Sequence, residues 1–359
     1  MTRASTEQRA RVEVLRNEAD GRPALHESTV RSLHAEVKEL PAVWLYDERG
    51  SRLYDEITRL PEYYLPRREG EILRARAAAI ARRTQARTLI ELGAGTAKNI
   101  RLLLDGLDTA GALERFVPLD VSEQTLRASA ETIAAAYPRV SVEAIVGDFE
   151  RDLGALPANG RRLIAFLGST IGNLYPEQRN GFLRTLAAVL ARDDAFLVGI
   201  DLVKDVARLE SAYNDSRGVT ELFVRNALTA VNRELGATFD QERFVYEARW
   251  DPEHEWMDIG LRARKAHAVS IQHLELDVAF EECEPLRVEI SSKFRRERFE
   301  LEAAKARLQV ESWWTDAAGD FAIALVLRDT SAGTKVNSKR EETACLQAAR
   351  SAATSTRSR

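Results

Sequence analysis

The feature that most constrains the fold is a set of aliphatic runs that recur at regular spacing. The first reads Leu-Ile-Glu-Leu-Gly-Ala-Gly-Thr over residues 89–96. A strand buried on both faces of a parallel sheet reads as a continuous aliphatic run, and glycines after it let backbone amides approach a ligand. Because ligands bind at the carboxyl ends of parallel strands, the pattern predicts a nucleotide-type ligand. The later runs cover 116–121, 142–149 and 163–169, and the first two of these carry Asp120 and Asp148 near their ends.

Helical patterns near 97–107, 122–137 and 177–191 alternate with these runs up to about residue 203. The alternation predicts an α/β fold with a doubly wound, mostly parallel sheet. A long helical pattern over 205–236 follows, and then short segments with period-2 alternation, which do not continue such a sheet. We therefore predict an inserted α+β domain. The chain closes with a helix near 296–307 and a hairpin of 309–314 and 321–327, whose turn residues are Asp-Ala-Ala-Gly-Asp.

Composition excludes several classes of function. A net charge of −4 supplies no basic excess for neutralising nucleic-acid phosphates. No apolar run reaches the roughly 18 residues of a membrane span, and the start of the chain lacks the apolar segment of a signal peptide. The two cysteines, Cys283 and Cys345, lie far apart and the five histidines lack metal-ligand spacing. We expect a cytoplasmic monomer that binds no metal.

An unusual string precedes the first aliphatic run. Residues 60–67 read Leu-Pro-Glu-Tyr-Tyr-Leu-Pro-Arg. Two prolines that bracket a tyrosine pair do not fit inside one helix, so we predict a shaped loop that presents aromatic rings. The alanine-rich segment 68–83 predicts a helix that leads into the strand.

The glycine turn by itself leaves several ligands open. A nicotinamide fingerprint needs a third glycine, and Lys98 occupies that position; no P-loop sequence occurs anywhere. Two strand-end acids, Asp120 and Asp148, suit a ligand with a ribose diol and an adenine amino group. S-adenosylmethionine meets this description, and the closing hairpin fits because the methyltransferase form of the sheet ends in an antiparallel strand pair. The alternative is that both aspartates merely cap helices or turns.

From about Trp44 to Arg328 the chain resembles the histidine-specific Nα-methyltransferases, which make hercynine (histidine betaine) on the route to ergothioneine. The resemblance is carried by long, unusual strings. They are Leu60-Pro61-Glu62-Tyr63-Tyr64, Glu91-Leu92-Gly93-x-Gly95-Thr96, Phe166 to Leu174 (Phe-Leu-Gly-Ser-Thr-Ile-Gly-Asn-Leu), Asp201-Leu202-Val203-Lys204-Asp205, Val231-Asn232-Arg233-Glu234-Leu235, Leu261-Arg262-Ala263-Arg264, Glu289 to Phe294 (Glu-Ile-Ser-Ser-Lys-Phe) and Trp313-Trp314-Thr315-Asp316.

The resemblance implies S-adenosylmethionine as methyl donor, L-histidine as acceptor and a role for individual residues. The cofactor would be held by Gly93, Asn99, Asp120, Asp148 and Phe149. The amino and carboxylate groups of histidine would be surrounded by Tyr63, Asn173 and Tyr213. The imidazole would be held by Glu289 and Ser291, with Ile290 between them also counted among the substrate-binding residues. We expect Tyr63 to be catalytic: it would orient the amine and accept the growing cation through cation–π attraction.

The helix and strand patterns, with a final stretch rich in Ser, Thr, Ala, Lys and Arg, predict a division of the chain into parts. Residues 1–66 would form an N-terminal helical segment and aromatic loop that belong to the substrate domain. The methyltransferase core would span 67–204, with the inserted substrate-binding domain at 205–288. The end of the core with its hairpin would take 289–330, and 331–359 would be a disordered tail.

Strand alternation supports part of this assignment from the residues alone. In residues 288–291 (Val-Glu-Ile-Ser), both polar side chains fall on one face and both aliphatic ones on the other. An acid and a hydroxyl two residues apart can meet the two nitrogens of one imidazole. The plain alternative is a solvent-exposed strand face. Likewise, Asn173 suits a turn and Tyr63 suits a core position.

Two positions depart from the family pattern. Asn99 stands where the family usually has lysine, and Ile259 stands where a pocket position is often methionine. Other functions remain to be separated from histidine methylation. They are Nα-methylation of tryptophan or tyrosine, a catalytically silent module that binds S-adenosylmethionine, and a nicotinamide dehydrogenase.

Overall fold

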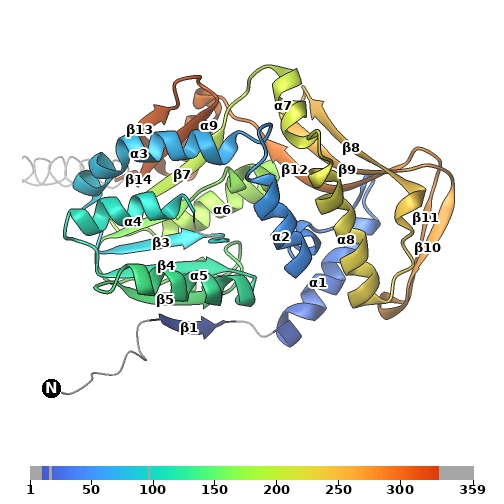
Figure 1. Cartoon of the computed structure of the whole chain (residues 1–359), viewed down its shortest axis with the longest axis horizontal. Helices are drawn as coiled ribbons and strands as arrows, with labels where there is room; N and C mark the ends of the chain where they lie inside the picture. The colour runs from blue at the N-terminus through green and yellow to red at the C-terminus, as the bar shows by residue number, and fades with distance from the viewer. Residues whose placement is uncertain (1–9, 16–17, 96–97, 331–359) are drawn as a thin grey trace, which may run out of the picture.

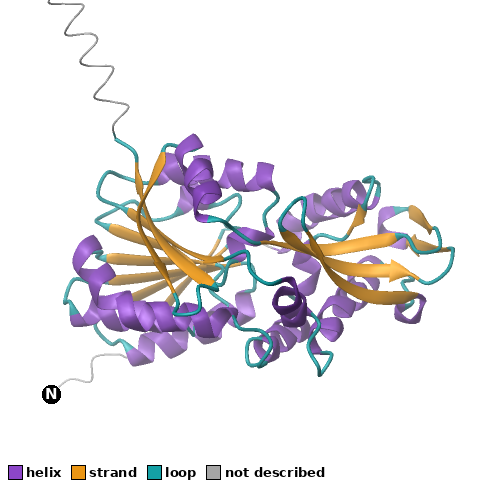
Figure 2. Ribbon diagram, turned by 90° about the horizontal axis from the view of Figure 1, so that it is seen from above, coloured by secondary structure: helices purple, strands orange, loops and turns teal. Residues whose placement is uncertain are grey.

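The computed structural model describes residues 10–15, 18–95 and 98–330 of the 359-residue chain. A large sheet and a smaller one lie side by side, with helices packed around each (Figure 1 and Figure 2). The predicted tail, 331–359, lies outside the described residues. Within the described part, no helix has the length and apolar character needed to cross a membrane.

The large sheet confirms the predicted fold class. Its strand order is β1-β5-β4-β3-β6-β7-β14-β13, in which β14 pairs antiparallel with both β7 and β13 and the other neighbours are parallel. This is a doubly wound sheet that closes with an antiparallel hairpin. The strands are β1 (Ala10–Val14), β3 (Thr88–Leu92), β4 (Arg115–Asp120), β5 (Ser141–Val146), β6 (Arg162–Phe166), β7 (Ala195–Asp201), β13 (Leu308–Thr315) and β14 (Phe321–Arg328).

Helices cover both faces of this sheet because its strands are apolar on both sides. Leu89 packs into an apolar layer with one set of helices, and the next residue, Ile90, packs into a separate layer with the other set. On one face lie α3 (Leu65–Thr84), α4 (Ile100–Thr109) and α5 (Glu123–Ala136). On the other face lie α6 (Pro176–Val189) and α9 (Arg296–Lys305).

The smaller sheet has the order β2-β12-β9-β8 and carries a separate hairpin of β10 and β11. Its apolar core is continuous with the α3 side of the large sheet. The strands are β2 (Lys38–Glu39), β8 (Phe244–Asp251), β9 (Trp256–Ala263), β10 (His267–Ile271), β11 (Leu276–Phe280) and β12 (Pro285–Ser292). The helices beside it are α1 (Glu18–Leu33), α2 (Glu48–Ile57), α7 (Val206–Tyr213) and α8 (Val219–Leu235). Short 3₁₀ turns occupy η1 (Ala42–Leu45), η2 (Leu153–Ala155), η3 (Thr170–Asn173), η4 (Gln241–Arg243) and η5 (Gln272–Leu274).

The structure refines several expected elements. The helical pattern over 205–236 is two helices, because the carboxylate of Asp215 accepts hydrogen bonds from the backbone amides of Val219 (3.0 Å) and Thr220 (2.8 Å) and so starts α8 anew. The loop expected over 60–67 was wrong for its last residues: Pro66 sits in the first turn of α3, where its missing N–H costs nothing.

At two places the predicted domain bounds do not coincide with the limits of the two sheets. Strands from residues 1–66 contribute to both sheets: β1 pairs with β5 of the large sheet, whereas β2 pairs with β12 of the smaller sheet. The boundary expected at 288/289 falls inside β12, whose pairing with β9 continues to Ser292. The bounds themselves stay a proposal.

The two sheets are joined where β7 and β12 end. The amide of Phe294 donates to the carbonyl of Asp201 at 2.9 Å, and the amide of Val203 donates to the carbonyl of Phe294 at 3.1 Å. Directly beside these bonds, the ammonium of Lys293 lies 2.8 Å from a carboxylate oxygen of Asp201. The end of one sheet is therefore fixed to the end of the other.

Candidate active site

The carboxyl edge of β3 and β4 forms an open backbone turn. Gly93 has φ +67°, and no atom lies within 4 Å of where its Cβ would be, so only glycine fits the turn comfortably and its surface stays open. Asp120, at the end of β4, accepts hydrogen bonds from the amides of Gly95 and Ser122, both at 2.9 Å. The turn and the first strand-end aspartate therefore form one unit, as the sequence predicts; Thr96 lies outside the described residues.

The end of β5 adds the second aspartate to the same edge. The amide of Gly147 donates to the carbonyl of Asp120 at 3.0 Å, which keeps the two strand ends together. Asp148 accepts the amide of Glu150 at 2.9 Å, and the half-buried ring of Phe149 packs edge-on against Phe166 with centroids 4.9 Å apart. The sequence-predicted cofactor residues Gly93, Asp120, Asp148 and Phe149 thus follow neighbouring strands.

A buried carboxylate cluster lies behind this edge, and we define it as Glu69, Glu91 and Asp120. Glu69 accepts hydrogen bonds from the side chain of Asn99 (2.8 Å) and the amide of Gly168 (2.7 Å), and burial raises its pKa to about 7. Burial and the neighbouring carboxylates also raise the pKa of Glu91 well above its usual range. Among the described residues, no partner contacts the buried Oε2 of Glu91.

Asn99 is attached to this cluster. Its amide nitrogen donates to the carbonyl of Pro66 at 3.0 Å as well as to Glu69. Gly199 on β7 lets Glu69 approach, because a Cβ there would lie 2.2 Å from the carboxylate. Sequence reasoning missed Glu69, which lies among exposed arginines of α3 and gives no local signal of its burial.

Strand β12 presents the second set of predicted residues. Glu289 and Ser291 project from one face, and the buried Ile290 projects from the other. The side-chain amide of Asn173, at the end of η3, donates to Glu289 Oε1 at 2.9 Å. The hydroxyl of Tyr46 lies 3.5 Å from the same oxygen.

Ser291 belongs to a buried group of hydroxyls. Its Oγ lies 2.8 Å from the hydroxyl of Tyr213, at the end of α7, and the ring of Tyr213 meets that of Tyr63 edge-on with centroids 6.0 Å apart. Tyr63 shares a hydrogen bond with Tyr54. Of the residues predicted to bind the amino acid, Tyr63, Tyr213 and Ser291 therefore form one group and Asn173 and Glu289 another, and β12 carries Glu289 and Ser291 on the same face.

We call Tyr46, Tyr54, Tyr63 and Tyr213 the tyrosine cluster. Burial raises the pKa of each, to about 12 for Tyr54 and well above 10 for the others, so all four phenols are neutral at physiological pH. Glu289 adds to the rise for Tyr46, Tyr54 and Tyr213 through its charge. Sequence reasoning named Tyr63 and Tyr213 and missed Tyr46 and Tyr54.

The segment that follows β6 connects the two sets. Gly168 donates its amide to Glu69 of the carboxylate cluster, and Asn173, at the far end of the same segment, donates to Glu289. Gly172 between them packs so closely that a Cβ would lie 2.8 Å from the carbonyl oxygen of Ser292. The string Leu-Gly-Ser-Thr-Ile-Gly-Asn is thus the physical bridge between the strand edge and β12.

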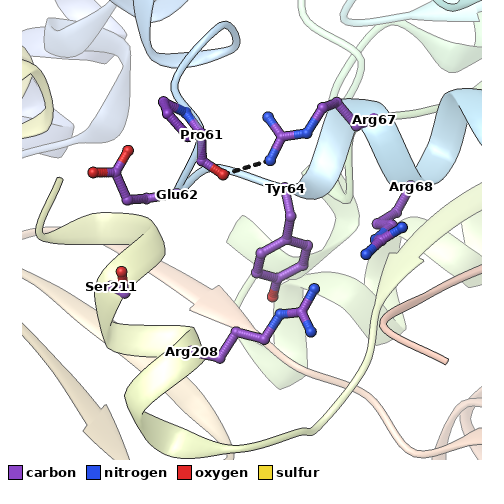
Figure 3. A pocket seen from close by; sticks show the side chains of 7 residues that line it. All are labelled: Pro61, Glu62, Tyr64, Arg67, Arg68, Arg208 and Ser211. Carbon is purple, nitrogen blue, oxygen red and sulfur yellow. Dashed lines mark hydrogen bonds between the residues drawn. The ribbon is translucent and has the colours of Figure 1, made fainter. Parts of the chain in front are cut away.

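Arg67 fixes the loop that carries Tyr63. Its guanidinium donates to the carbonyls of Leu60 (2.7 Å), Pro61 (2.5 Å) and Tyr63 (3.2 Å). Figure 3 shows the bond between Arg67 and the carbonyl of Pro61 beside a hollow of about 380 Å³, which is lined by Pro61, Glu62, Tyr64, Arg67, Arg68, Arg208 and Ser211. None of the sequence-predicted site residues lines this hollow.

The described residues offer no cluster of histidine, cysteine or carboxylate side chains that could hold a metal ion. The site consists instead of carboxylates, hydroxyls, one amide and aromatic rings. Such a set can bind a cation at the strand edge and a polar ring at β12, and it holds both on one connected framework.

Comparison with known proteins identifies relatives of this chain. The family model described as "Histidine-specific methyltransferase, SAM-dependent" matches residues 25–328. A histidine N-alpha-methyltransferase from Mycolicibacterium smegmatis is 48% identical over 305 residues, which cover 85% of this chain and 95% of that protein. The protein of the same name from Mycobacterium tuberculosis is 47% identical over 308 residues, which cover 86% of this chain and 96% of that protein. Ergothioneine biosynthesis protein 1 of Neurospora crassa is 32% identical over 77% of this chain and 32% of its own length.

Glu289 gives the unliganded protein a pH-dependent stability. Burial raises its pKa from 4.5 to about 7, against the hydrogen bond from Tyr46 and the charge of Lys293, which lower it. The folded protein therefore holds a proton that the unfolded chain loses above about pH 4.5. The free energy of unfolding that this group contributes is complete below that pH and is lost as the pH rises to 7.

We predict that Glu289→Gln reduces the fall in the free energy of unfolding between pH 5 and pH 8. Urea titrations of both proteins at the two pH values measure this fall. Part of it will remain in the variant, because Glu69 and Glu91 also have raised pKa values. An identical fall in variant and wild type would show that Glu289 is ionised throughout.

Proposed function

Because the chain belongs to the family of histidine-specific, S-adenosylmethionine-dependent methyltransferases, we propose that it transfers methyl groups from S-adenosylmethionine to the α-amino nitrogen of L-histidine. Three transfers give hercynine, the betaine of histidine, which is the first step toward ergothioneine. Relatives named histidine N-alpha-methyltransferase match nearly their whole length, and a fungal relative is named for ergothioneine biosynthesis.

The strand edge fits the methyl donor. S-adenosylmethionine carries a sulfonium and an ammonium, and the carboxylate cluster contains the buried Oε2 of Glu91, which has no hydrogen-bond partner among the described residues. A bound cation would supply the partner that this oxygen needs. The bare turn at Gly93 leaves room for close approach, and Asp120, Asp148 and Phe149 would hold the ribose and adenine ends. The bound cofactor supplies an activated methyl group to a nucleophile.

The observation that carries the choice of histidine is the Glu289–Ser291 pair on β12. Glu289 supplies a carboxyl group that Asn173 holds by one oxygen, and Ser291 supplies a hydroxyl that Tyr213 holds. Imidazole has two ring nitrogens, separated by one carbon, whose hydrogen-bonding directions diverge; in the neutral ring one is a donor and the other an acceptor. A carboxylate and a hydroxyl on one strand face match those two nitrogens.

The residues around the amine must also remove its proton. An ammonium has no lone pair, and partial burial favours the neutral amine by disfavouring the charged form. A hydroxyl or water must then carry the proton away, and alignment of the amine with the methyl group supplies much of the acceleration. After the third transfer the nitrogen is a permanent cation, which the faces of buried tyrosine rings can attract.

We assign the orienting role to Tyr63. It is 7% exposed, its loop is fixed by Arg67, and its ring meets Tyr213 beside Ser291. Its raised pKa keeps the hydroxyl protonated, so Tyr63 orients the amine as a neutral hydrogen-bonding group, and it would relay the amine proton only by donating its own to Tyr54 at the same time. We also propose that the enzyme works as a cytoplasmic monomer; light scattering on the purified protein tests the second half of that statement.

The activity is tested by incubating purified protein with S-adenosylmethionine and a pool of the twenty amino acids. We predict that mass spectrometry finds a gain of three methyl groups on histidine alone, and no gain when S-adenosylmethionine is omitted. Trimethylation of tryptophan or tyrosine would instead support the related aromatic acceptors. Binding of S-adenosylmethionine without any methylated product would point to a silent binding module.

The role of Tyr63 is tested by Tyr63→Phe, which removes the hydroxyl and keeps the ring. We predict a fall of about 10²-fold in the rate of each methylation, because positioned proton carriers typically contribute that much or more. Tyr137→Phe is the matched control, since its hydroxyl bonds to Asp105 on the outer surface of the large body. Equal rates in the wild type and both variants, measured by product formation over time, would remove Tyr63 from the mechanism.

A further inference from the structure

A lysine with no exposed surface lies directly behind the substrate hydroxyls. The side chain of Lys293 is 0% exposed, although it follows a strand whose neighbours bind substrate in the proposed function. Its ammonium donates to the hydroxyl of Tyr213 at 2.7 Å and to Oγ of Ser291 at 2.8 Å, and it pairs with Asp201 at 2.8 Å. An ammonium has three N–H groups, so every one of them has a partner.

These contacts determine what the two hydroxyls can do. Tyr213 and Ser291 each accept a hydrogen bond from Lys293, which leaves each one proton to donate. One of those protons is used in the bond between the two oxygens. Among the described residues, no further acceptor lies within hydrogen-bond distance of either oxygen. The pair therefore keeps a single proton for a ligand.

The lysine is held in this position from the other side. Asp201 is fully buried, and its carboxylate accepts from Lys293, from Lys204 at 2.6 Å and from the hydroxyl of Tyr64 at 2.9 Å. Because Asp201 ends β7 and Lys293 follows β12, the pair joins the methyltransferase sheet to the substrate sheet. A lysine that is buried without such an anion would lose its charge or force the site open.

We propose that Lys293 is the positioning residue for substrate recognition: it orients the hydroxyls of Tyr213 and Ser291 so that this pair offers one donor to the ligand. The inference rests on the proposed function and deepens it. A pair with one available proton recognises a hydrogen-bond acceptor, and the unprotonated nitrogen of a neutral imidazole is such an acceptor. Glu289 on the same face takes the N–H of the opposite nitrogen.

The specificity that follows is a matter of counting donors and acceptors. A ring that lacks an acceptor nitrogen, such as indole, would leave the available proton of the pair without a partner in a buried place, which is costly. Lys293 thereby contributes to the rejection of tryptophan although it does not touch the ligand. Without the two N–H groups of Lys293, nothing would fix the directions in which the hydroxyls of Tyr213 and Ser291 point their protons.

The chain offers a matched control in Lys204. It binds the same carboxylate of Asp201 as Lys293 does, and it contacts neither Tyr213 nor Ser291. Lys293→Met and Lys204→Met therefore each remove one cation from Asp201 and leave the other in place. Only the first removes the donors to the substrate hydroxyls.

The test is isothermal titration of L-histidine into each variant in the presence of S-adenosylhomocysteine, with KM and kcat measured alongside. We expect Lys293→Met to raise the Kd and KM for histidine at least tenfold, a loss of about 1.4 kcal/mol, with the Kd of S-adenosylhomocysteine unchanged. Lys204→Met should change the Kd for histidine less than twofold. Equal effects of the two substitutions would overturn the inference.

A double-mutant cycle separates positioning from general structural damage. In a Ser291→Ala background, Lys293→Met should cost much less histidine affinity than in the wild type, since one of the oriented hydroxyls is already gone. An undiminished cost would overturn the inference. Should Lys293→Met fail to fold, Asp201→Asn/Lys293→Met removes both charges together, and the same tenfold loss is expected against Asp201→Asn alone. Methylation by the wild type tests the proposed function separately, because the inference depends only on the ratio between variants.

Discussion

A buried ion pair between Asp201 and Lys293 stands where the two sheets of this protein meet. Burying two charges is expensive, and the pair is tolerated because each charge is fully hydrogen-bonded. Asp201 also binds Lys204 and Tyr64, and Lys293 also binds two hydroxyls. Backbone hydrogen bonds between the ends of β7 and β12 flank the pair, and neither charged side chain has any exposed surface. The two halves of the proposed active site lie on either side of this contact, so their relative position depends on it.

The two halves make opposite demands on charge. At the strand edge, a buried carboxyl group whose Oε2 has no hydrogen-bond partner among the described residues can pair with a cationic ligand, which fits S-adenosylmethionine. At β12 the acceptor must lose a proton from its amine and still be held by its ring. That position is surrounded by the neutral tyrosine cluster, the amide of Asn173, the hydroxyl of Ser291 and the carboxyl group of Glu289. The segment from Gly168 to Asn173 is hydrogen-bonded to both halves and so connects the proposed donor and acceptor sites.

The sequence predicted those parts that depend on local pattern. Aliphatic runs and the glycine turn identified the sheet and its binding edge, since strand periodicity and turn chemistry are properties of neighbouring residues. Alternation placed Glu289 and Ser291 on one face. What the sequence could not indicate were partners far apart in the chain: Glu69 under the strand edge, Tyr46 beside Glu289, and Lys293 against Asp201. Asn99, expected at the cofactor, donates to Glu69 in the structure, which only the packing of α3 against α4 reveals. Family resemblance supplied the acceptor, because no local pattern distinguishes a substrate strand from an exposed one.

The central claim is that the strand edge and β12 hold methyl donor and histidine on one rigid framework. A crystal structure with S-adenosylhomocysteine and L-histidine tests it most directly. The account predicts the imidazole nitrogens within hydrogen-bond distance of Glu289 and Ser291, with the α-amino nitrogen between Tyr63 and the cofactor sulfur. An imidazole bound away from β12, with Glu289 and Ser291 still in contact with Asn173 and Tyr213 alone, would contradict it.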